Sequence, residues 1–229
     1  MAKAAGGRQL KPSASATEPR VAGLIAFAQQ RKQDSRERLL AAGVTRFCEN
    51  GYISISVEDI ASAAGVSRIT FYRHFGCKAD LAVELFKRAA AAAMPEFLRI
   101  GHSQFRDRAV VLQWIADLFA ADRANRQLLR VFIQATIDTA DFTRRAQELI
   151  SELIMRLGET IPAFAVHPDR ASERRRWLEA WLLLFEILDQ SNHAALDSGI
   201  ATDPIVTEIL ADRFVAFVAG AAEPRSARP

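Results

Sequence analysis

The side chains most suited to chemistry stand between residues 67 and 78, in the stretch SRITFYRHFGCK. Arg68, Ile69, Thr70, Tyr72 and Arg73 follow one another within this stretch. A guanidinium binds phosphate or donates two hydrogen bonds to guanine, a hydroxyl binds phosphate, and isoleucine or threonine contacts the thymine methyl group. Such a set is poorly suited to a solvated helix face. The residue types therefore predict contact with nucleic acid.

Two short helices are expected to position these side chains. Ser56 is a good N-cap, and Asp59 can complete a capping box three residues later. Gly65 stands where the first helix should stop, because glycine tolerates positive φ. Ser67 then caps a second helix that ends near Phe75. Two short helices joined by a glycine turn form the helix-turn-helix pattern, whose second helix enters a DNA major groove.

The second helix has an inner and an outer face. Phe71 and Phe75 are four residues apart, so together with Val66 they can hold the helix on a core. The other side chains are left to point outward. The predicted base-reading residues are Arg68, Ile69, Thr70 and Arg73. The predicted phosphate-binding residues are Ser56, Ser67, Tyr72, His74 and Lys78, with Tyr72 able to contact bases as well.

The run IASAAGVSRITFYRHFGCKADL, residues 60–81, resembles the N-terminal domain of the TetR-type bacterial repressors. The matching positions are Ile60, Ala61, Ala64, Gly65, Val66, Ser67, Thr70, Tyr72, His74, Phe75, Lys78 and Leu81. The resemblance implies a DNA-binding head, a helical body that dimerises and senses a ligand, and a fourth helix that links them. Ile69 and Cys77 depart from the family pattern, so base specificity cannot be transferred and a looser start of the fourth helix is expected.

The composition predicts an all-α protein. Among 229 residues, 50% are hydrophobic and only 8 are Pro and 11 are Gly. No apolar run reaches the roughly 18 residues of a membrane span, and no signal peptide is recognisable. We therefore expect a cytoplasmic protein that does not associate with membranes.

The sequence offers little for catalysis or metal binding. The motifs of phosphate-binding loops, serine hydrolases and zinc proteases are absent, and two cysteines are too few for a usual zinc site. His193 follows Asp189 by four residues, which is a weak two-ligand spacing and more typical of ordinary polar residues. We predict no enzyme, no metal and no cofactor. A helical enzyme that merely contains a helix-turn-helix would need convergent titratable groups, and none can be named.

The charge is distributed unevenly. Residues 1–88 contain 14 Lys and Arg against 8 Asp and Glu, an excess of +6, whereas residues 89–229 contain 16 against 19, or −3. A basic excess on the helix-turn-helix half is what phosphate neutralisation requires.

The chain is predicted to divide into four segments. These are a flexible basic N-terminal tail (1–30), a helix-turn-helix domain (31–78), a helical effector-binding and dimerisation domain (79–221) and a flexible C-terminus (222–229). The cations of the tail either touch DNA or belong to an unstructured segment, and residues 21–30 are apolar enough for a short helix. Further helices are predicted from Asp34 or Ser35 to Asn50, from Lys78 or Ala79 to Met94, over 106–122, 124–138 and 141–158, from Pro168 to Asp197, and from Asp203 to Gly220.

The last two helices are predicted to form a dimer interface. The stretch WLEAWLLLFEIL, residues 177–188, is apolar on nearly every side, and such a helix is normally buried all round. One face can pack on its own domain, and the other needs a partner. We expect a charge at Leu184 or Phe217 to disturb the dimer or the fold. The alternative is a core helix of a monomer, whereas a palindromic DNA operator requires a two-fold symmetric homodimer.

The effector site is predicted in the body. The predicted ligand-binding residues are Trp114, Phe119, Phe132, Gln134, Asp138 and Trp181. Each aromatic residue is equally well explained as plain core, and each polar one as part of a solvated helix face.

Together these features predict a TetR-like DNA-binding regulator. We expect a repressor that leaves a palindromic operator when an unknown, mostly apolar small molecule binds. The alternative is an effector-independent architectural or protein-interaction factor on the same fold, which a body without a cavity would favour.

Overall fold

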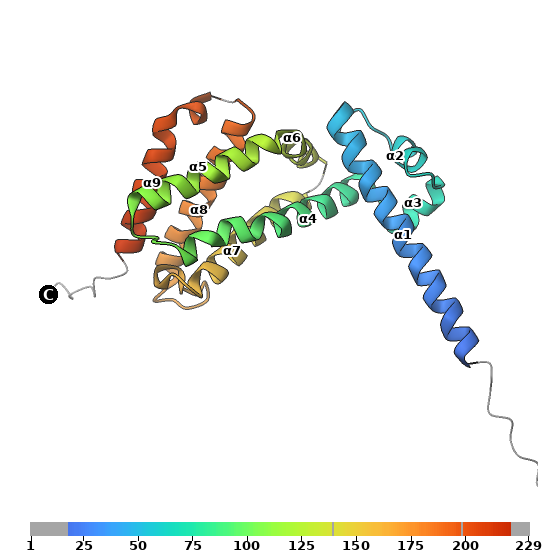
Figure 1. The fold of residues 1–229 in the computed structure, drawn as a ribbon, viewed down its shortest axis with the longest axis horizontal. Helices are drawn as coiled ribbons and strands as arrows, with labels where there is room; N and C mark the ends of the chain where they lie inside the picture. The colour runs from blue at the N-terminus through green and yellow to red at the C-terminus, as the bar shows by residue number, and fades with distance from the viewer. Residues whose placement is uncertain (1–17, 139, 198, 221–229) are drawn as a thin grey trace, which may run out of the picture.

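The computed structural model describes residues 18–138, 140–197 and 199–220. These residues form α-helices and short 3₁₀ helices with no strand among them, which confirms the predicted all-α class (Figure 1). The head contains α1 (Glu18–Asn50), α2 (Val57–Ala63) and α3 (Arg68–His74). The body contains α4 (Lys78–Leu98), α5 (Arg108–Ala124), α6 (Arg126–Ala135), α7 (Ala140–Gly158), α8 (Arg174–Ala195) and α9 (Pro204–Ala219). Residues 1–17 of the predicted tail and the predicted C-terminal segment 222–229 lie outside the described residues.

Helix α4 leads from the head into the body, whereas α1 extends past α3 on the side away from the body (Figure 1). Short 3₁₀ helices connect the body helices at Arg99–His102, Pro162–Phe164 and Gly199–Thr202. Helices α5, α6, α7 and α9 begin and end within three residues of their predicted bounds.

The first helix is longer than predicted, because it begins at Glu18 rather than at Asp34 or Ser35. The hydroxyl of Ser35 does not cap a helix start; it donates to the carbonyl of Lys32 in the preceding turn (2.9 Å). Side-chain pairs four residues apart, such as Gln30 with Asp34 (2.8 Å), support the exposed part of the helix. The predicted boundary at residue 30 therefore falls inside a helix.

Pro95 was predicted to kink α4 or to end it near Met94, and it does not end the helix. The helix continues to Leu98 with the proline inside it. Proline removes one helical N–H and normally breaks a helix, so the turn that follows needs other support.

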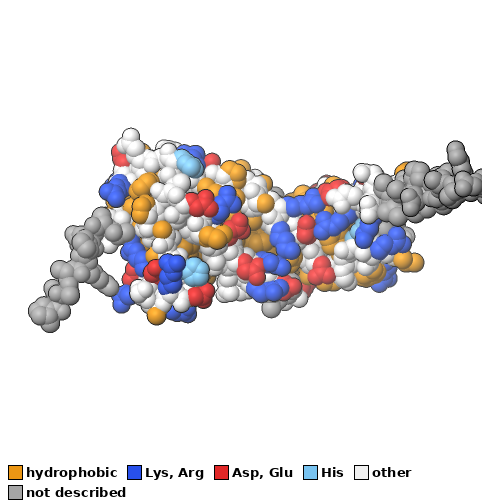
Figure 2. Space-filling model, turned by 90° about the horizontal axis from the view of Figure 1, so that it is seen from below, with side chains coloured by type: hydrophobic (Ala, Val, Ile, Leu, Met, Phe, Trp, Pro, Cys, Tyr) orange, Lys and Arg blue, Asp and Glu red, His pale blue; other side chains and the backbone are white. Residues whose placement is uncertain are grey.

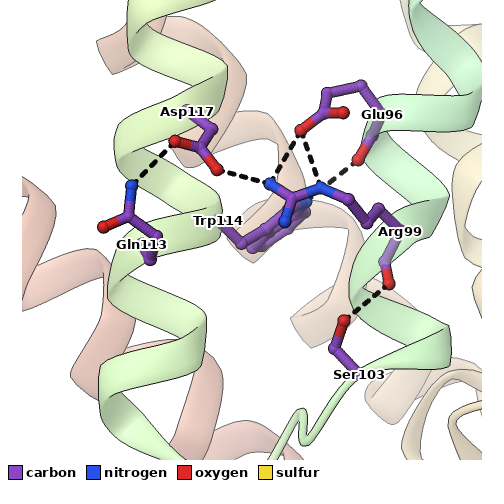
Figure 3. A network of polar contacts seen from close by, with 6 residues as sticks. All are labelled: Glu96, Arg99, Ser103, Gln113, Trp114 and Asp117. Atoms are coloured by element: carbon purple, nitrogen blue, oxygen red, sulfur yellow. Dashed lines mark hydrogen bonds and ion pairs between the residues drawn. The ribbon is translucent and has the colours of Figure 1, made fainter.

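Contacts with α5 supply this support, as Figure 3 shows. The indole of Trp114 donates to the carbonyl of Glu96 (3.2 Å). The guanidinium of Arg99 bridges the carboxylates of Glu96 (2.8 Å) and Asp117 (2.6 Å). Gln113 donates to the other oxygen of Asp117 (2.8 Å). Tertiary contacts thus override the local effect of the proline.

Helix α8 begins at Arg174, not at the predicted Pro168. Residues 168–173 form turns, and the carboxylate of Glu173 holds them by accepting from the backbone N–H of His167 (2.8 Å) and from Arg170 (3.1 Å). Because the Glu173 carboxylate binds these residues, the segment keeps its turn structure and does not extend α8 toward its N-terminus.

Two hydrophobic cores stabilise the fold. The first lies within the body and includes Trp114, Ile115 and Phe214. The second joins the head to α4, α6 and α7. In it, the ring of Phe86 lies 5.3 Å from that of Phe132 and 5.3 Å from that of Phe142, measured between centroids. The core of the head therefore continues into the body across the predicted boundary at residues 78 and 79.

Candidate nucleic-acid interface

The turn between α2 and α3 is built as predicted. Ser56 accepts from the backbone N–H of Asp59 (3.2 Å), whose carboxylate accepts from the backbone N–H of Ser56 (2.9 Å), which confirms the capping box. Gly65 adopts a φ of +62°. Ser67 caps α3 by accepting from the N–H of Thr70 (3.2 Å), and the hydroxyls of these two residues are 3.0 Å apart. Both serines therefore have structural partners, and their contact with phosphate stays a prediction.

The two faces of α3 differ as predicted. Phe71 is fully buried and Phe75 is 5% exposed, so the aromatic pair anchors the helix in the second core. On the other face, Ile69 is 74% exposed and Tyr72 is 45% exposed. Arg68 and Arg73 are also exposed, whereas Thr70 is half-buried. A short helix fixed on one side thus presents arginines, a phenol and a bare isoleucine on the other.

Arg68 has partners on two elements. Its guanidinium lies 2.5 Å from the carboxylate of Glu58 on α2, and it lies 5.4 Å from the ring centroid of Tyr72, one turn further along α3. The sequence analysis did not include Glu58. The signal that could have found it is its place in the first turn of α2, beside the start of α3 in a helix-turn-helix.

His74 connects α3 to α1. Its Nε2 atom lies 2.8 Å from the hydroxyl of Ser35, which is 8% exposed. Partial burial lowers the pKa of His74, and the nearby charges of Lys32, Arg36 and Arg73 lower it further. Figure 2 shows Lys and Arg side chains gathered on this end of the molecule. These effects favour the neutral imidazole, and a phosphate contact by that form of His74 would use a neutral N–H donor.

The ammonium of Lys78 binds backbone carbonyls, whereas a phosphate contact would need free N–H donors. Its ammonium donates to the backbone carbonyls of Tyr52 (3.0 Å), Ile53 (3.3 Å) and Ile55 (3.2 Å). It also lies 4.4 Å from the ring centroid of Tyr52. An ammonium has three N–H donors, so these carbonyls use all of them. Lys78 thus fixes the loop between α1 and α2 to the start of α4.

The same loop is bound to the body by two residues that were predicted to bind ligand. Gln134 accepts from the backbone N–H of Tyr52 (3.0 Å), and Asp138 accepts from the Tyr52 hydroxyl (2.7 Å). Burial raises the pKa of Tyr52, and the bond to Asp138 raises it further. Tyr52 was absent from the predicted site residues. An aromatic residue directly after Gly51, in an otherwise short connection, is the signal that could have found it.

Residues 39–85 match the family described as bacterial regulatory proteins, tetR family. The similarity to this family therefore covers the helix-turn-helix part of the chain. It is 30% identical over 80 residues to the HTH-type transcriptional repressor NemR of Escherichia coli strain K12, and the match covers 34% of this chain and 40% of NemR. The chain thus spans less than half of the length of this curated relative.

Solved structures of transcriptional regulators share the fold over most of the chain. A transcriptional regulator from Streptomyces coelicolor A3(2) matches with a TM-score of 0.59 at 21% identity, covering 79% of this chain and 98% of the other. The Thermus thermophilus TetR-family repressor FadR, solved with lauroyl-CoA, matches with a TM-score of 0.56 at 18% identity, covering 85% and 98%. At these identities the likeness shows the fold alone.

The predicted ligand-binding residues do not line one common site. Trp114 is 1% exposed in the body core, with Phe119 packed against the same core. Phe132 lies in the second core. The ring of Trp181 stacks on that of Phe185 at 5.3 Å between centroids. With Gln134 and Asp138 bonded to Tyr52, all six residues have a packing or hydrogen-bonding role, and these roles are divided between the body core, the second core and the contact with Tyr52.

Two hollows lie elsewhere. One, of about 510 Å³, is an open groove on the head between α1 and α2, lined largely by alanines together with Arg38 and Arg46. The other, of about 450 Å³, lies on the body between α7, the 164–173 segment and the first turn of α8. Its walls include Ile154, Met155 and Trp177. None of the six predicted residues lines either hollow.

The described residues contain no group of three or more metal-ligating side chains. His193 and Asp189 lie beside each other, with 3.5 Å between Nδ1 and the carboxylate, and have no third ligand with them. Along the part of the chain that the structure describes, no helix combines the length and hydropathy of a membrane span.

Proposed function

We propose that this chain is a homodimeric transcriptional regulator that binds a palindromic double-stranded DNA operator through α3 and represses transcription there. The observation that carries the proposal is the outer face of α3, where Arg68, Ile69, Tyr72 and Arg73 are exposed around the fully buried Phe71. An isoleucine that is 74% exposed between arginines does nothing for folding, but it matches thymine methyl groups between phosphate walls. The repressor role is supported by the name of the similar Escherichia coli protein.

In the proposed function, residues 31–78 bind DNA, and residues 79–221 dimerise and bind the effector. Apolar side chains on the outer faces of the last two helices support a homodimer. Leu178, Leu182 and Phe185 recur at helical spacing on α8 and are 42%, 59% and 45% exposed. Ile205 and Ile209 on α9 are 58% and 46% exposed. Contiguous exposed apolar side chains of this kind mark interaction surfaces, and a second copy of the chain offers the matching face.

We propose that the effector is a small, mostly apolar molecule and that it occupies the body hollow between α7 and α8. The volume of about 450 Å³ falls within the range of ligand pockets. The walls of the hollow are mostly apolar, and His167, Arg170 and Glu173 also line it. The lauroyl-CoA bound by the structurally similar FadR supports a ligand with an apolar chain. Ligand would favour a state in which the two heads no longer match successive grooves, which requires different affinities for the two states.

One experiment tests the proposal. The wild-type protein selects binding sites from random double-stranded DNA, and gel-shift titrations then measure affinity for the selected sequence. We expect a palindrome whose half-sites are about 34–36 Å, or a multiple, apart. Arg73→Ala should weaken binding about 5- to 100-fold, because one base or phosphate contact is lost. Arg156→Ala, which removes a half-buried arginine from α7, is the control and should bind as the wild type does.

No enriched sequence would contradict the function, and equal binding by the two arginine variants would contradict the role of α3. Lauroyl-CoA added to the protein–DNA complex then separates two forms of the function. Release of DNA supports an effector-controlled repressor. Retention of DNA, with unchanged tryptophan fluorescence, shows that this ligand is not the effector. It is also the result expected of an effector-independent DNA-binding factor, which the use of the six predicted ligand residues in packing and bonding favours.

A further inference from the structure

A carboxylate stands on the face that we propose meets DNA. Glu58, in the first turn of α2, is 53% exposed at its side chain and lies 2.5 Å from Arg68 at the start of α3. An exposed ion pair contributes little to folding stability. A carboxylate directed toward phosphates also lowers affinity by repulsion. Neither folding nor general DNA affinity therefore explains the pair.

The pair connects two helices across a hydrogen-bonded turn. Glu58 and Arg68 come from different helices, and the turn between them is closed by a hydrogen bond from the N–H of Val66 to the carbonyl of Ala61 (3.0 Å). The centroid of the Tyr72 ring, one turn further along α3, lies 5.4 Å from the Arg68 guanidinium. A guanidinium has five N–H donors, so one carboxylate leaves donors for a further acceptor. The pair thus presents hydrogen-bond donors directly beside hydrogen-bond acceptors.

We propose that Glu58 and Arg68 together read one G·C base pair, so that Glu58 is a specificity-determining residue of the interface. In the major groove this base pair offers the guanine O6 and N7 acceptors beside the cytosine N4 donor. Arg68 donates to guanine while Glu58 accepts from cytosine. Phosphates offer acceptors only, so Glu58 gains nothing from them and disfavours unspecific DNA. The inference rests on the proposed DNA-binding function and deepens it.

The test uses the full chain and the operator selected by the wild-type protein. Each base pair of the operator is replaced in turn, and affinities are measured for the wild type, Glu58→Ala, Glu58→Gln and Arg68→Ala. Glu152→Ala, which removes an exposed carboxylate from α7, controls for net charge. Random-sequence DNA measures unspecific binding, and thermal melting checks the fold. Should Glu58→Ala fail to fold, the nearly isosteric Glu58→Gln carries the comparison.

We expect Arg68→Ala and both Glu58 variants to lose discrimination at the same G·C pair, by about fivefold or more. Glu58→Ala should also bind random DNA more tightly than Glu152→Ala does. Full discrimination by both Glu58 variants at the pair that Arg68→Ala relaxes would overturn the inference and leave the proposed function intact. Loss at a different base pair would overturn it equally. A wild-type protein that enriches no sequence would instead refute the proposed function, and the inference with it.

Discussion

The head and the body use polar side chains in opposite ways. On α3, Arg73 and Tyr72 are directed to solvent around a helix that apolar residues hold in place. In the body, Gln134 and Asp138 are engaged by Tyr52, and the Trp114 indole is engaged by the Glu96 carbonyl. The outer face of α3 therefore keeps Arg73 and Tyr72 available for a partner, whereas these three body residues fix the loop at Tyr52 and the end of α4. On α8 and α9 the body also exposes apolar side chains.

The largest effect is predicted for a charge on the exposed apolar face of α8. Leu182→Glu should convert the dimer to a monomer, because a charge would have to be buried in the interface. Operator affinity should fall about a hundredfold or more, since two linked heads gain from effective concentration. Sedimentation equilibrium and gel shift measure both. Met155→Glu introduces the same charge at an exposed apolar position on α7, 63% exposed, and should stay dimeric.

A Leu182→Glu protein that remains a dimer with full operator affinity would show that the partner surface lies elsewhere. Leu184 and Phe217, which the sequence suggested for this test, are unsuitable. They are only 4% and 9% exposed in the body core, so a charge there would unfold the chain whatever its oligomeric state.

The next prediction concerns the junction between head and body. Tyr52→Phe removes the hydroxyl that donates to Asp138 at 2.7 Å and should lower the free energy of unfolding by about 1 kcal/mol. Tyr72→Phe makes the same chemical change on α3, where the hydroxyl has only a 3.4 Å contact with Arg68, and should leave stability unchanged. Urea denaturation of both variants provides the measurement. Equal stabilities would mean that the Asp138 bond is not structural and that Asp138 is free for a ligand.

The difference between head and body also explains what the sequence could predict. In the head, the type of residue is set by its place in a helix cap, in a tight turn or on the face that we propose enters the DNA groove. Ser56, Gly65 and Ser67 could therefore be assigned from residue type and spacing, and all three occupy the predicted positions. Lys78 could not be assigned in this way, because a lysine has the same sequence signal whether it binds phosphate or three carbonyls.

In the body, hydrophobic spacing predicted most helices but not their tertiary partners. Pro95 should have ended α4, yet the Arg99 network holds the next turn. A polar residue on an apolar stretch, such as Gln134, has one sequence signature for a ligand contact and for a hydrogen bond to a loop 82 residues away. Long-range partners of this kind depend on the assembled fold, so sequence spacing alone does not reveal them.

The smallest effect is expected at a polar pair inside the body. Asp122 on α5 is half-buried and accepts from the hydroxyl of Ser191 on α8 (2.5 Å). Burial raises the pKa of Asp122, and the Ser191 bond offsets this only in part. Because the folded-state pKa lies above the unfolded one, the contribution of Asp122 to stability is complete at pH values below the unfolded pKa. It is lost as the pH rises through the folded pKa.

Asp122→Asn keeps an acceptor for Ser191 but carries no charge. The variant should therefore be more stable than the wild type at pH 7, by about 1 kcal/mol or less in the free energy of unfolding. This advantage should be lost as the pH falls toward 4. Asp212→Asn provides the opposite case, because the bond to Arg108 lowers the pKa of Asp212, and this variant should be slightly less stable than the wild type at pH 7. Thermal melting across this pH range distinguishes the two. If Asp122→Asn were destabilised at neutral pH, the Asp122 carboxylate would have a stabilising partner beyond Ser191, and the body would then hold a charge in place much as the head holds Arg68.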